Sequence, residues 1–242
     1  MKPAIRLSGI QELGVKFVWT HDAFRVGEDG PTHQPVEQEA QIRLLEKLKN
    51  LSGKPSFLAL RPADSAETSV AWKMALENTN SPSGLILSRQ GIKDLPSQGD
   101  SRYGDALAAE KGGYLVKEVE NPDVVLIANG SEVSTLVEAA KLLEEKEGLK
   151  VNIASIISEG VFRQQSKAYQ ESVIPKNKPL YGLTAGLPVN LEGLVGDNGK
   201  VFGVDHFGYS APASVLDEKF GFTGEQVSQN VMEYLNTNVL IK

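Results

Sequence analysis

The chain has 242 residues, 40% of them hydrophobic and 23% charged, and a formal net charge of −6. This is the composition of a soluble globular protein, long enough for one large domain or two ordinary ones. The scattered Lys and Arg residues argue against a nucleic-acid partner and against binding to acidic membranes. No apolar run approaches the roughly 20 residues of a spanning helix, and the first residues do not resemble a signal peptide. The absence of cysteine excludes disulfides and thiolate sites, so we expect a cytoplasmic α/β protein.

The first part of the chain alternates strand patterns with helix patterns. A helix over 1–14, closed by Gly14, is followed by a buried strand over 15–19. The pattern then predicts a helix from Val36 to near Asn50, a strand over 56–62, a capped helix over 64–78 and a strand over 84–90. This order predicts parallel strands with right-handed crossovers. The loop after the first strand and Arg89 after the third should therefore lie at the same edge of one sheet.

A second α/β unit follows a polar, glycine-bearing segment, residues 96–114, which we interpret as a linker. Its expected strands are 124–128, 151–156, 179–184 and 201–204. A long amphipathic helix closed by Gly148 follows the first of them, and shorter helices are expected over 217–220 and 224–234. The whole chain is thus expected to be α/β, in two units.

The loop between Thr20 and Pro35 holds two of the chain's three histidines. It also contains these charged residues: Asp22, Arg25, Glu28 and Asp29. Titratable groups at this density are costly beside a sheet unless they bind something. The spacing of His21 and His33 is not that of a standard metal site. Two histidines, an aspartate and an arginine at one sheet edge instead suit a phosphorylated, polyhydroxylated small molecule.

Two other features favour structural interpretations. Residues 129–132 lie where a strand becomes a helix and could cradle an anion, but they lack the spacing of a nucleotide-binding loop. Helix capping by Asn129 or Ser131 explains them. His206 lies in a loop with glycine and proline, where a lone histidine is more often a surface or capping residue than a catalyst.

The segments Thr20–Asp22 and Val26–Pro35 together resemble the signature of the transketolase family. Further similar segments follow the family's order: Met1–Ser8, Arg61–Trp72, Leu87–Gln90, Asn129–Val133, Glu171–Pro175 and Gly203–Ala213. The resemblance covers essentially the whole chain. It implies two three-layer α/β/α domains: an incomplete pyrimidine-binding domain over 1–95 and a smaller, Rossmann-like C-terminal domain over 115–242.

Transketolases use thiamine diphosphate to move a two-carbon ketol unit from a ketose phosphate to an aldose phosphate, in the pentose phosphate pathway. Carried over by position, the resemblance implies that His21 and Arg89 hold the sugar phosphate. Asp29 would bind a hydroxyl beside the reacting carbon. His33 would lie against the thiamine near its aminopyrimidine, as a catalytic and cofactor-binding residue. The cofactor carries the carbanion chemistry, so the protein mainly orients and protonates.

The chain departs from the family in three places. Ala23–Arg25 replaces a common Ser-Ile-Gly, away from the matched polar positions, and we interpret it as lineage variation. Ile156–Gly160 replaces a Met-Pro segment in a domain that does not carry the chemistry. The diphosphate-binding domain, with its Gly-Asp-Gly metal motif, and the glutamate that activates the cofactor have no match. We therefore expect a C-terminal section, inactive alone, whose partner N-terminal section holds the diphosphate and its Mg²⁺ or Ca²⁺, with the family's homodimer as the expected assembly.

Two alternatives remain. A related thiamine-diphosphate enzyme, such as a 2-oxoacid dehydrogenase E1 β subunit or a deoxyxylulose-phosphate synthase, has the same architecture, but the Thr-His-Gln-Pro ending and Arg89 favour transketolase. A non-catalytic assembly or regulatory module is the other, and drift in such a module would be expected to erode the Thr20–Pro35 loop first.

Overall fold

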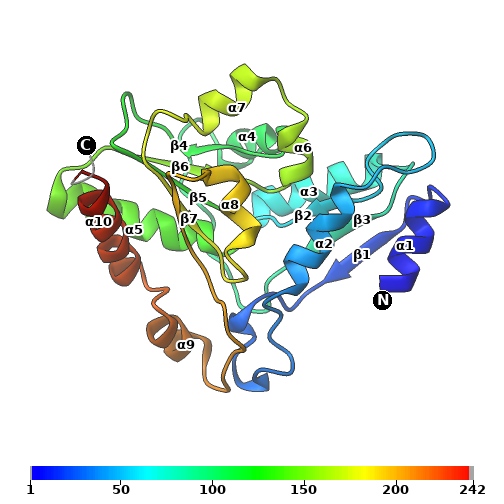
Figure 1. The fold of residues 1–242 in the computed structure, drawn as a ribbon, viewed down its shortest axis with the longest axis horizontal. Coiled ribbons are helices and arrows are strands. Elements are labelled where there is room, and N and C mark those ends of the chain that lie inside the picture. Colours follow the sequence, from blue (N-terminus) through cyan, green and yellow to red (C-terminus); the bar gives the residue numbers. More distant parts are fainter. Residues whose placement is uncertain (1, 240–242) are drawn as a thin grey trace.

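The computed structural model describes residues 2–239, which form two α/β units built on separate sheets (Figure 1). We call the residues around the first sheet, 2–95, the first unit, and those around the second sheet, 114–239, the second unit. The first sheet has the order β1-β3-β2 and is parallel throughout. Its strands are β1 (Lys16–Trp19), β2 (Leu58–Leu60) and β3 (Ser83–Ile86). The predicted parallel alternation is confirmed, with β2 and β3 shorter than expected.

Helices cover both faces of this sheet. On one face α1 (Lys2–Ile10) and α2 (Gln38–Glu46) pack with Phe57 and Ala59, and on the other α3 (Ser65–Glu77) packs with Leu60 and Leu85. The start of α3 has the predicted capping residues. The Asp64 carboxylate accepts a hydrogen bond from the Glu67 amide at 2.8 Å, and the Glu67 carboxylate accepts one from the Ala63 amide at 2.8 Å.

The second sheet has the order β4-β6-β5-β7-β8. Its strands are β4 (Tyr114–Lys117), β5 (Val124–Ala128), β6 (Val151–Ser155), β7 (Leu180–Leu183) and β8 (Lys200–Phe202). The helices on one face are α5 (Glu132–Glu147) and α10 (Gly224–Val239), and those on the other are α6 (Glu159–Arg163), α7 (Lys167–Val173) and α8 (Val189–Val195). Both units are therefore three-layer α/β/α structures, as expected. The one departure within the sheet is β4, which was not predicted and pairs antiparallel with β6.

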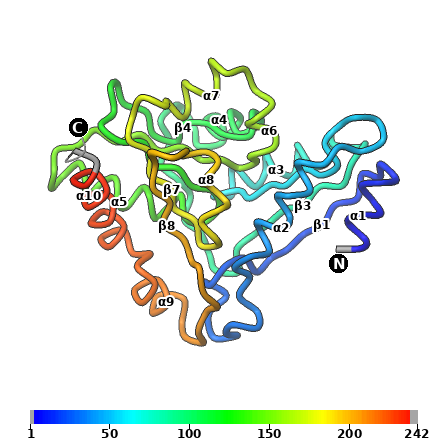
Figure 2. Tube along the Cα trace, viewed as in Figure 1, coloured from blue at the N-terminus to red at the C-terminus, as the bar shows by residue number. Residues whose placement is uncertain are grey.

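The two units share one hydrophobic core. A single cluster of buried side chains includes Leu60 and Leu85 from the first unit and Leu126 and Leu136 from the second. A late segment of the chain also lies near the first unit. The segment before α9 (Ala213–Phe220) runs beside the loop after β1 in both the ribbon and the tube views (Figure 2). The relative placement of the units is therefore set by packed side chains.

Two expectations about the elements were wrong. The first helix ends at Ile10, and Gly14 does not cap it; Glu12 takes the left-handed conformation instead (φ 55°), and its carboxylate accepts hydrogen bonds from the amide and hydroxyl of Ser52. The strand over 15–19 is not buried, because β1 pairs only with β3 among the described residues and leaves Val18 42% exposed.

The segment 96–114, interpreted from the sequence as a linker, has secondary structure of its own. It contains α4 (Arg102–Ala106) and a 3₁₀ helix, η2 (Leu107–Lys111). Ala106 and Ala109 are fully buried in the shared core, and Arg102 forms ion pairs with Asp64 at 2.6 Å and Glu67 at 3.3 Å. Because most of the segment is polar, the sequence did not indicate that these two small residues are buried.

Among the helices of residues 2–239, none has both the length and the apolar content needed to cross a bilayer.

A substitution at Gly84, on the central strand of the first sheet, tests how closely the side chains pack there. A Cβ at this position would lie 2.5 Å from Cζ3 of Trp19 and 2.6 Å from Cζ of Phe57. We expect Gly84→Ala to lower the free energy of unfolding by about 1–3 kcal/mol, because the crowded rings must move, as measured by urea unfolding. Gly91→Ala is the control: apart from Gly91 and its two chain neighbours, no residue that the structure describes has an atom within 4 Å of the position its methyl group would take, so its effect should stay within about 0.5 kcal/mol. Equal effects of the two substitutions would contradict the close packing.

Candidate functional site

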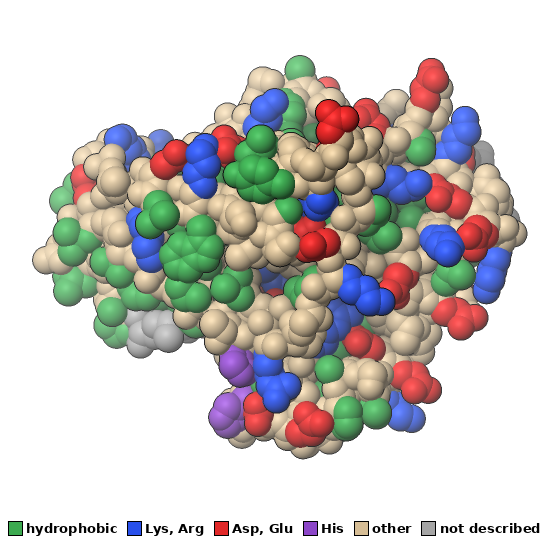
Figure 3. Space-filling view, turned by 180° about the vertical axis from the view of Figure 1, so that it is seen from behind, with side chains coloured by type: hydrophobic (Ala, Val, Ile, Leu, Met, Phe, Trp, Pro, Cys, Tyr) green, Lys and Arg blue, Asp and Glu red, His purple; other side chains and the backbone are tan. Residues whose placement is uncertain are grey.

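The loop from Thr20 to Pro35 begins at the carboxyl end of β1, beside the end of β3. In the parallel register Trp19 is opposite Ile86, and the Asp22 amide donates a hydrogen bond to the Leu87 carbonyl at 3.2 Å. The predicted common edge for this loop and the segment that carries Arg89 is therefore confirmed. In the space-filling view, histidine side chains gather at one end of the molecule, next to charged groups (Figure 3).

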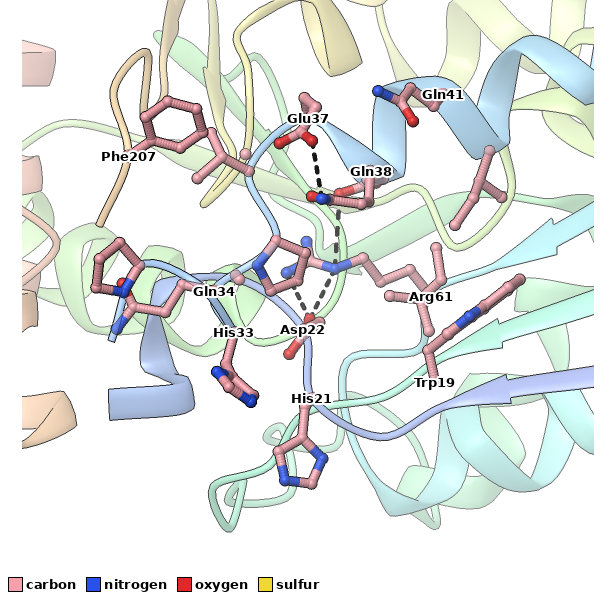
Figure 4. A pocket seen from close by; sticks show the side chains of 18 of the residues that line it. Trp19, His21, Asp22, His33, Gln34, Glu37, Gln38, Gln41, Arg61 and Phe207 are labelled. Atoms are coloured by element: carbon pink, nitrogen blue, oxygen red, sulfur yellow. Dashed lines mark hydrogen bonds and ion pairs between the residues drawn. The ribbon is translucent and has the colours of Figure 1, made fainter. Parts of the chain in front are cut away.

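A cavity of about 530 Å³ opens between this loop, the start of α2 and the end of the first sheet. Its apolar wall is formed by Ile5, Trp19, Ile42, Leu45 and Ile86. His21 and His33 both line it, on the same side of Asp22 (Figure 4). The Nδ1 atom of each imidazole lies 2.9 Å from the hydroxyl of the preceding threonine. The structure thus brings together the two histidines singled out in the sequence.

Asp29 and Arg89 are placed differently. Both side chains are exposed, and neither is among the residues that line the cavity. Asp29 ends the 3₁₀ helix η1 (Phe24–Asp29), and Arg89 follows β3. They lie outside the cavity that holds His21 and His33.

Arg61 lines the same cavity, and its guanidinium group is buried, with the residue only 1% exposed. Nη2 lies 2.7 Å from Asp22 Oδ2, Nε donates to the same oxygen at 2.9 Å, and Nη1 donates to Glu132 and to the Asn129 carbonyl. Burial alone lowers the pKa of Arg61, but the carboxylates of Glu132, Asp22 and Glu39 outweigh it and hold that pKa well above its ordinary value. Arg61 therefore remains a fixed positive charge.

Asp22 presents an acceptor to the cavity. Its Oδ2 atom is paired with Arg61, whereas Oδ1 is buried and has no hydrogen-bond partner among residues 2–239. Burial raises the pKa of Asp22, and the nearby Glu132 adds to the increase, while Arg61 opposes it. An unpaired buried oxygen costs free energy unless a donor reaches it, so Asp22 Oδ1 is an acceptor that residues 2–239 leave unsatisfied.

Glu39, a residue of the cavity lining, forms hydrogen bonds with the second unit. Its carboxylate accepts hydrogen bonds from Arg43 at 2.8 Å and from the amide groups of Asn129 and Asn190, both of the second unit, at 3.3 Å. Burial alone raises the pKa of Glu39, but the guanidinium groups of Arg61 and Arg43 outweigh it and lower that pKa. Gly186 and Phe207 of the second unit line the cavity, so its wall is made jointly by the two units.

The expected capping role of residues 129–132 was wrong. Ser131 makes no side-chain hydrogen bond to the first turn of α5; its hydroxyl donates to Glu132 at 2.8 Å and accepts from Arg25 at 3.0 Å. The Asn129 side chain lies between Arg61 and Glu39. His206, by contrast, is an exposed loop residue as expected, and packs edge-on against Phe220 at 5.0 Å.

Two family models match the chain. Residues 1–93 match the transketolase pyrimidine-binding domain, and residues 112–223 match the transketolase-like C-terminal domain. A transketolase of Staphylococcus aureus is 42% identical over 236 residues, which cover 96% of this chain and 33% of that protein. The chain belongs to the transketolase family.

Solved structures agree with this assignment. A transketolase variant from Pichia stipitis in complex with xylulose 5-phosphate is 33% identical, with a TM-score of 0.86 over 98% of this chain and 32% of that one. A split-gene transketolase, described as an inactive β4 tetramer, shares the fold at 24% identity, with a TM-score of 0.68 over 93% of this chain and 68% of that one. The chain spans about a third of the length of the curated transketolases that it matches.

The residues that the sequence did not single out are Arg61, Glu39 and Glu132. Arg61 belongs to a segment that resembles the family, and it directly follows the apolar strand β2, which was the one available signal. Its partner Glu132 is 71 positions away, in the other unit. No local spacing rule relates residues so distant in sequence.

Glu39 generates a prediction about pH. Because the folded-state pKa of Glu39 lies below its ordinary value of 4.5, its ionised form stabilises the fold above that pH, and this stabilisation is lost as the pH falls through the folded-state pKa. At pH 7 we expect Glu39→Gln to lower the free energy of unfolding by about 1–3 kcal/mol. The difference from the parent chain should shrink below pH 4.5, as followed by urea unfolding at several pH values.

Exposed Glu77 supplies the control for this prediction. Its carboxylate lies 3.6 Å from Lys73 and is 65% exposed. Glu77→Gln should therefore change the free energy of unfolding by less than about 0.5 kcal/mol at every pH. A pH-independent effect of Glu39→Gln would contradict the assigned role of its charge.

Proposed function

We propose that this chain supplies part of the active site of a transketolase, namely the part that faces the sugar phosphate and the thiamine. A transketolase is a transferase that moves a two-carbon ketol unit from a ketose phosphate to an aldose phosphate. The observation that carries the proposal is that His21 and His33, from a loop with the family's signature, line one cavity at the end of a parallel sheet. Ligands in open α/β sheets bind outside the carboxyl ends of the strands. The family assignment supplies the reaction class.

In this proposal each site residue has a distinct role. His21 and Arg89 bind the sugar phosphate, because a guanidinium group and an imidazole are both suited to phosphate oxygens. Asp29 accepts a hydrogen bond from a hydroxyl beside the reacting carbon. His33 contacts the thiamine and holds or releases a proton, as an imidazole does near neutral pH. The relative from Pichia stipitis that holds xylulose 5-phosphate supports a ketose phosphate as the donor class.

The cavity fits one end of thiamine diphosphate. Trp19 and Ile86 contribute to its apolar wall, and Asp22 Oδ1 is an acceptor without a partner in the described part of the chain. Together these features suit an aromatic ring with an amino group. The diphosphate end is not matched: Arg61, the one Lys or Arg that residues 2–239 place in the cavity lining, is already paired with carboxylates. Among the same residues, no group of three His, Cys, Asp or Glu side chains is arranged to hold a metal ion.

When bound, thiamine diphosphate supplies the electron sink for breaking and forming the carbon–carbon bond. The residues of this chain would orient the substrate and the ring, exclude water with the wall around Trp19, and move a proton at the His33 imidazole. The diphosphate and its Mg²⁺ or Ca²⁺ would be held by an N-terminal transketolase section, in a homodimeric assembly. The inactivity stated for the split-gene β4 tetramer is consistent with such a division of the site.

Arg89 tests the phosphate assignment. In the chain combined with an N-terminal transketolase section, Arg89→Ala should raise the KM for xylulose 5-phosphate about 10- to 100-fold, because a charge-assisted hydrogen bond of about 1.5–3 kcal/mol is lost. The kcat should change much less. Arg163→Ala, which removes an exposed arginine of the second unit, is the control and should leave both constants unchanged.

The same assay identifies the reaction. Ketol transfer from xylulose 5-phosphate, with no turnover of pyruvate, would support a transketolase over a 2-oxoacid dehydrogenase component. An unchanged KM in the Arg89→Ala enzyme would remove Arg89 from the phosphate site. Turnover of pyruvate alone would overturn the proposed function.

The cofactor is tested by calorimetry on the chain alone. Titration with thiamine diphosphate and Mg²⁺ should give no micromolar binding, because residues 2–239 give the cavity no unpaired cation or metal site for the diphosphate. Addition of an N-terminal section should produce binding that His33→Ala weakens. Micromolar binding to the isolated chain would show that its own residues complete the cofactor site.

A further inference from the structure

We call the loop from Thr20 to Pro35 the site loop. Its segment Ala23–Arg25 attaches it to the second unit. Phe24 is fully buried, and its ring packs edge-on against Phe220 and Phe222 of the second unit, with centroid distances of 5.0 and 4.9 Å. The loop that carries His21 and His33 therefore places an aromatic side chain inside the neighbouring unit. This is the segment in which the sequence departs from the common family pattern.

Arg25 makes a second connection beside Phe24. Its guanidinium group is 6% exposed and donates hydrogen bonds from all three nitrogen atoms. Nε donates to Asp217 at 2.7 Å, Nη1 to Glu132 at 2.9 Å, and Nη2 to Thr135 at 3.1 Å. All of these acceptors belong to α5 and α9 of the second unit. A buried arginine with two carboxylate partners and hydrogen bonds from each of its three nitrogen atoms is held in a fixed position.

The other end of the loop is held by the second unit as well. The Gln34 side chain, directly after His33, donates hydrogen bonds to the Gly27 carbonyl at 2.8 Å and to the Tyr209 carbonyl at 3.0 Å. The Ser210 hydroxyl donates to the Glu28 carbonyl. The contacts with Tyr209 and Ser210 come from the segment before α9, which runs beside this loop (Figures 1 and 2).

The backbone directly before Phe24 is strained. Ala23 has φ 58° and ψ −170°, a left-handed conformation that is unfavourable for a residue with a Cβ. Such a conformation persists only where the surroundings over-determine it. The residue that follows is Phe24, so the anchor directly adjoins the strained position.

We propose that Phe24 and Arg25 are positioning residues, through which the second unit holds the His21–His33 loop in its working conformation. Neither lines the cavity of His21 and His33, so neither is a catalytic residue. Asp29 and His33 lie between the Phe24–Arg25 anchor and the Gln34 anchor. Displacement of Phe24 and Arg25 should release the intervening loop while leaving the sheets intact. The chemical role of the loop rests on the proposed function, but its attachment to the second unit does not.

Amide hydrogen exchange on the full 242-residue chain tests the attachment without any activity measurement. The reporters are loop amides with intraloop acceptors: Gly30 to Gly27 at 3.1 Å, and His33 and Gln34 to Gly30 at 3.0 and 3.2 Å. In Arg25→Met and in Phe24→Leu we expect their protection to fall at least about tenfold more than that of the β5 amides, because local opening exposes them without global unfolding.

Arg102→Met is the matched control. Arg102 is also a mostly buried arginine with two carboxylate partners, but these partners, Asp64 and Glu67, are outside the site loop. Its loss should lower the protection of loop and β5 amides to the same extent. Equal losses in the loop for Arg25→Met and Arg102→Met would overturn the proposal. Unfolding of both loop variants with a folded Arg102→Met chain would also overturn it, since the contacts would then be general core packing.

Kinetics on the combined enzyme connects the attachment to function. Arg25→Met should raise the KM for xylulose 5-phosphate and lower kcat together, and Arg25→Lys should restore part of both, because an ammonium group can still reach one carboxylate. Arg102→Met should leave both constants near those of the parent. If the parent enzyme transfers no ketol unit, the proposed function fails while the exchange result still decides the attachment. An active enzyme unaffected by Arg25→Met would overturn the positioning role.

Discussion

The buried guanidinium group of Arg61 is the interaction on which the rest of this structure depends. It comes from the first unit, pairs there with Asp22, and pairs in the second unit with Glu132. An arginine does not lose its proton in proteins, and a buried ion that loses its partner is strongly destabilising. Separation of the two units at this point would therefore break the Arg61–Glu132 ion pair. The shared hydrophobic core gives them cohesion, whereas the ion pairs specify one relative position.

The same network makes the wall of the cavity. Arg61 fixes Asp22, which adjoins His21, lines the cavity and has one buried oxygen that the described residues leave without a partner. Glu39, at the start of α2, is held by Arg43 from its own helix and by Asn129 and Asn190 from the second unit. The residues assigned to chemistry all belong to the first unit. Side chains of the second unit nevertheless contact two residues of the cavity lining, Arg61 and Glu39, and help to hold them in place.

The cavity lining also suits only part of the cofactor. It offers an apolar wall, two imidazoles and an unpaired carboxylate oxygen, which suit a ring and hydroxyl groups. Within residues 2–239, Arg61 is the only Lys or Arg in its lining and is neutralised by carboxylates, so these residues leave the cavity without a free cation for a diphosphate. This asymmetry is a property of the residues present. It explains in electrostatic terms why the proposed function divides the transketolase site between two sections.

The sequence by itself determined the alternation of strands and helices, the parallel order around β3, the capped start of α3 and the loop with the two histidines. These features depend on periodicity and local spacing, which a single chain displays directly. Only the tertiary structure decided that β1 is partly exposed, that β4 runs antiparallel, that residues 96–114 contain buried helical turns, and that Asp29 and Arg89 lie outside the cavity. It alone showed that Ala23–Arg25, interpreted from sequence as lineage variation, packs into the second unit. The reason is physical: Arg25 meets Asp217 across 192 positions, and no local pattern encodes a contact that exists only after both units have folded and packed together.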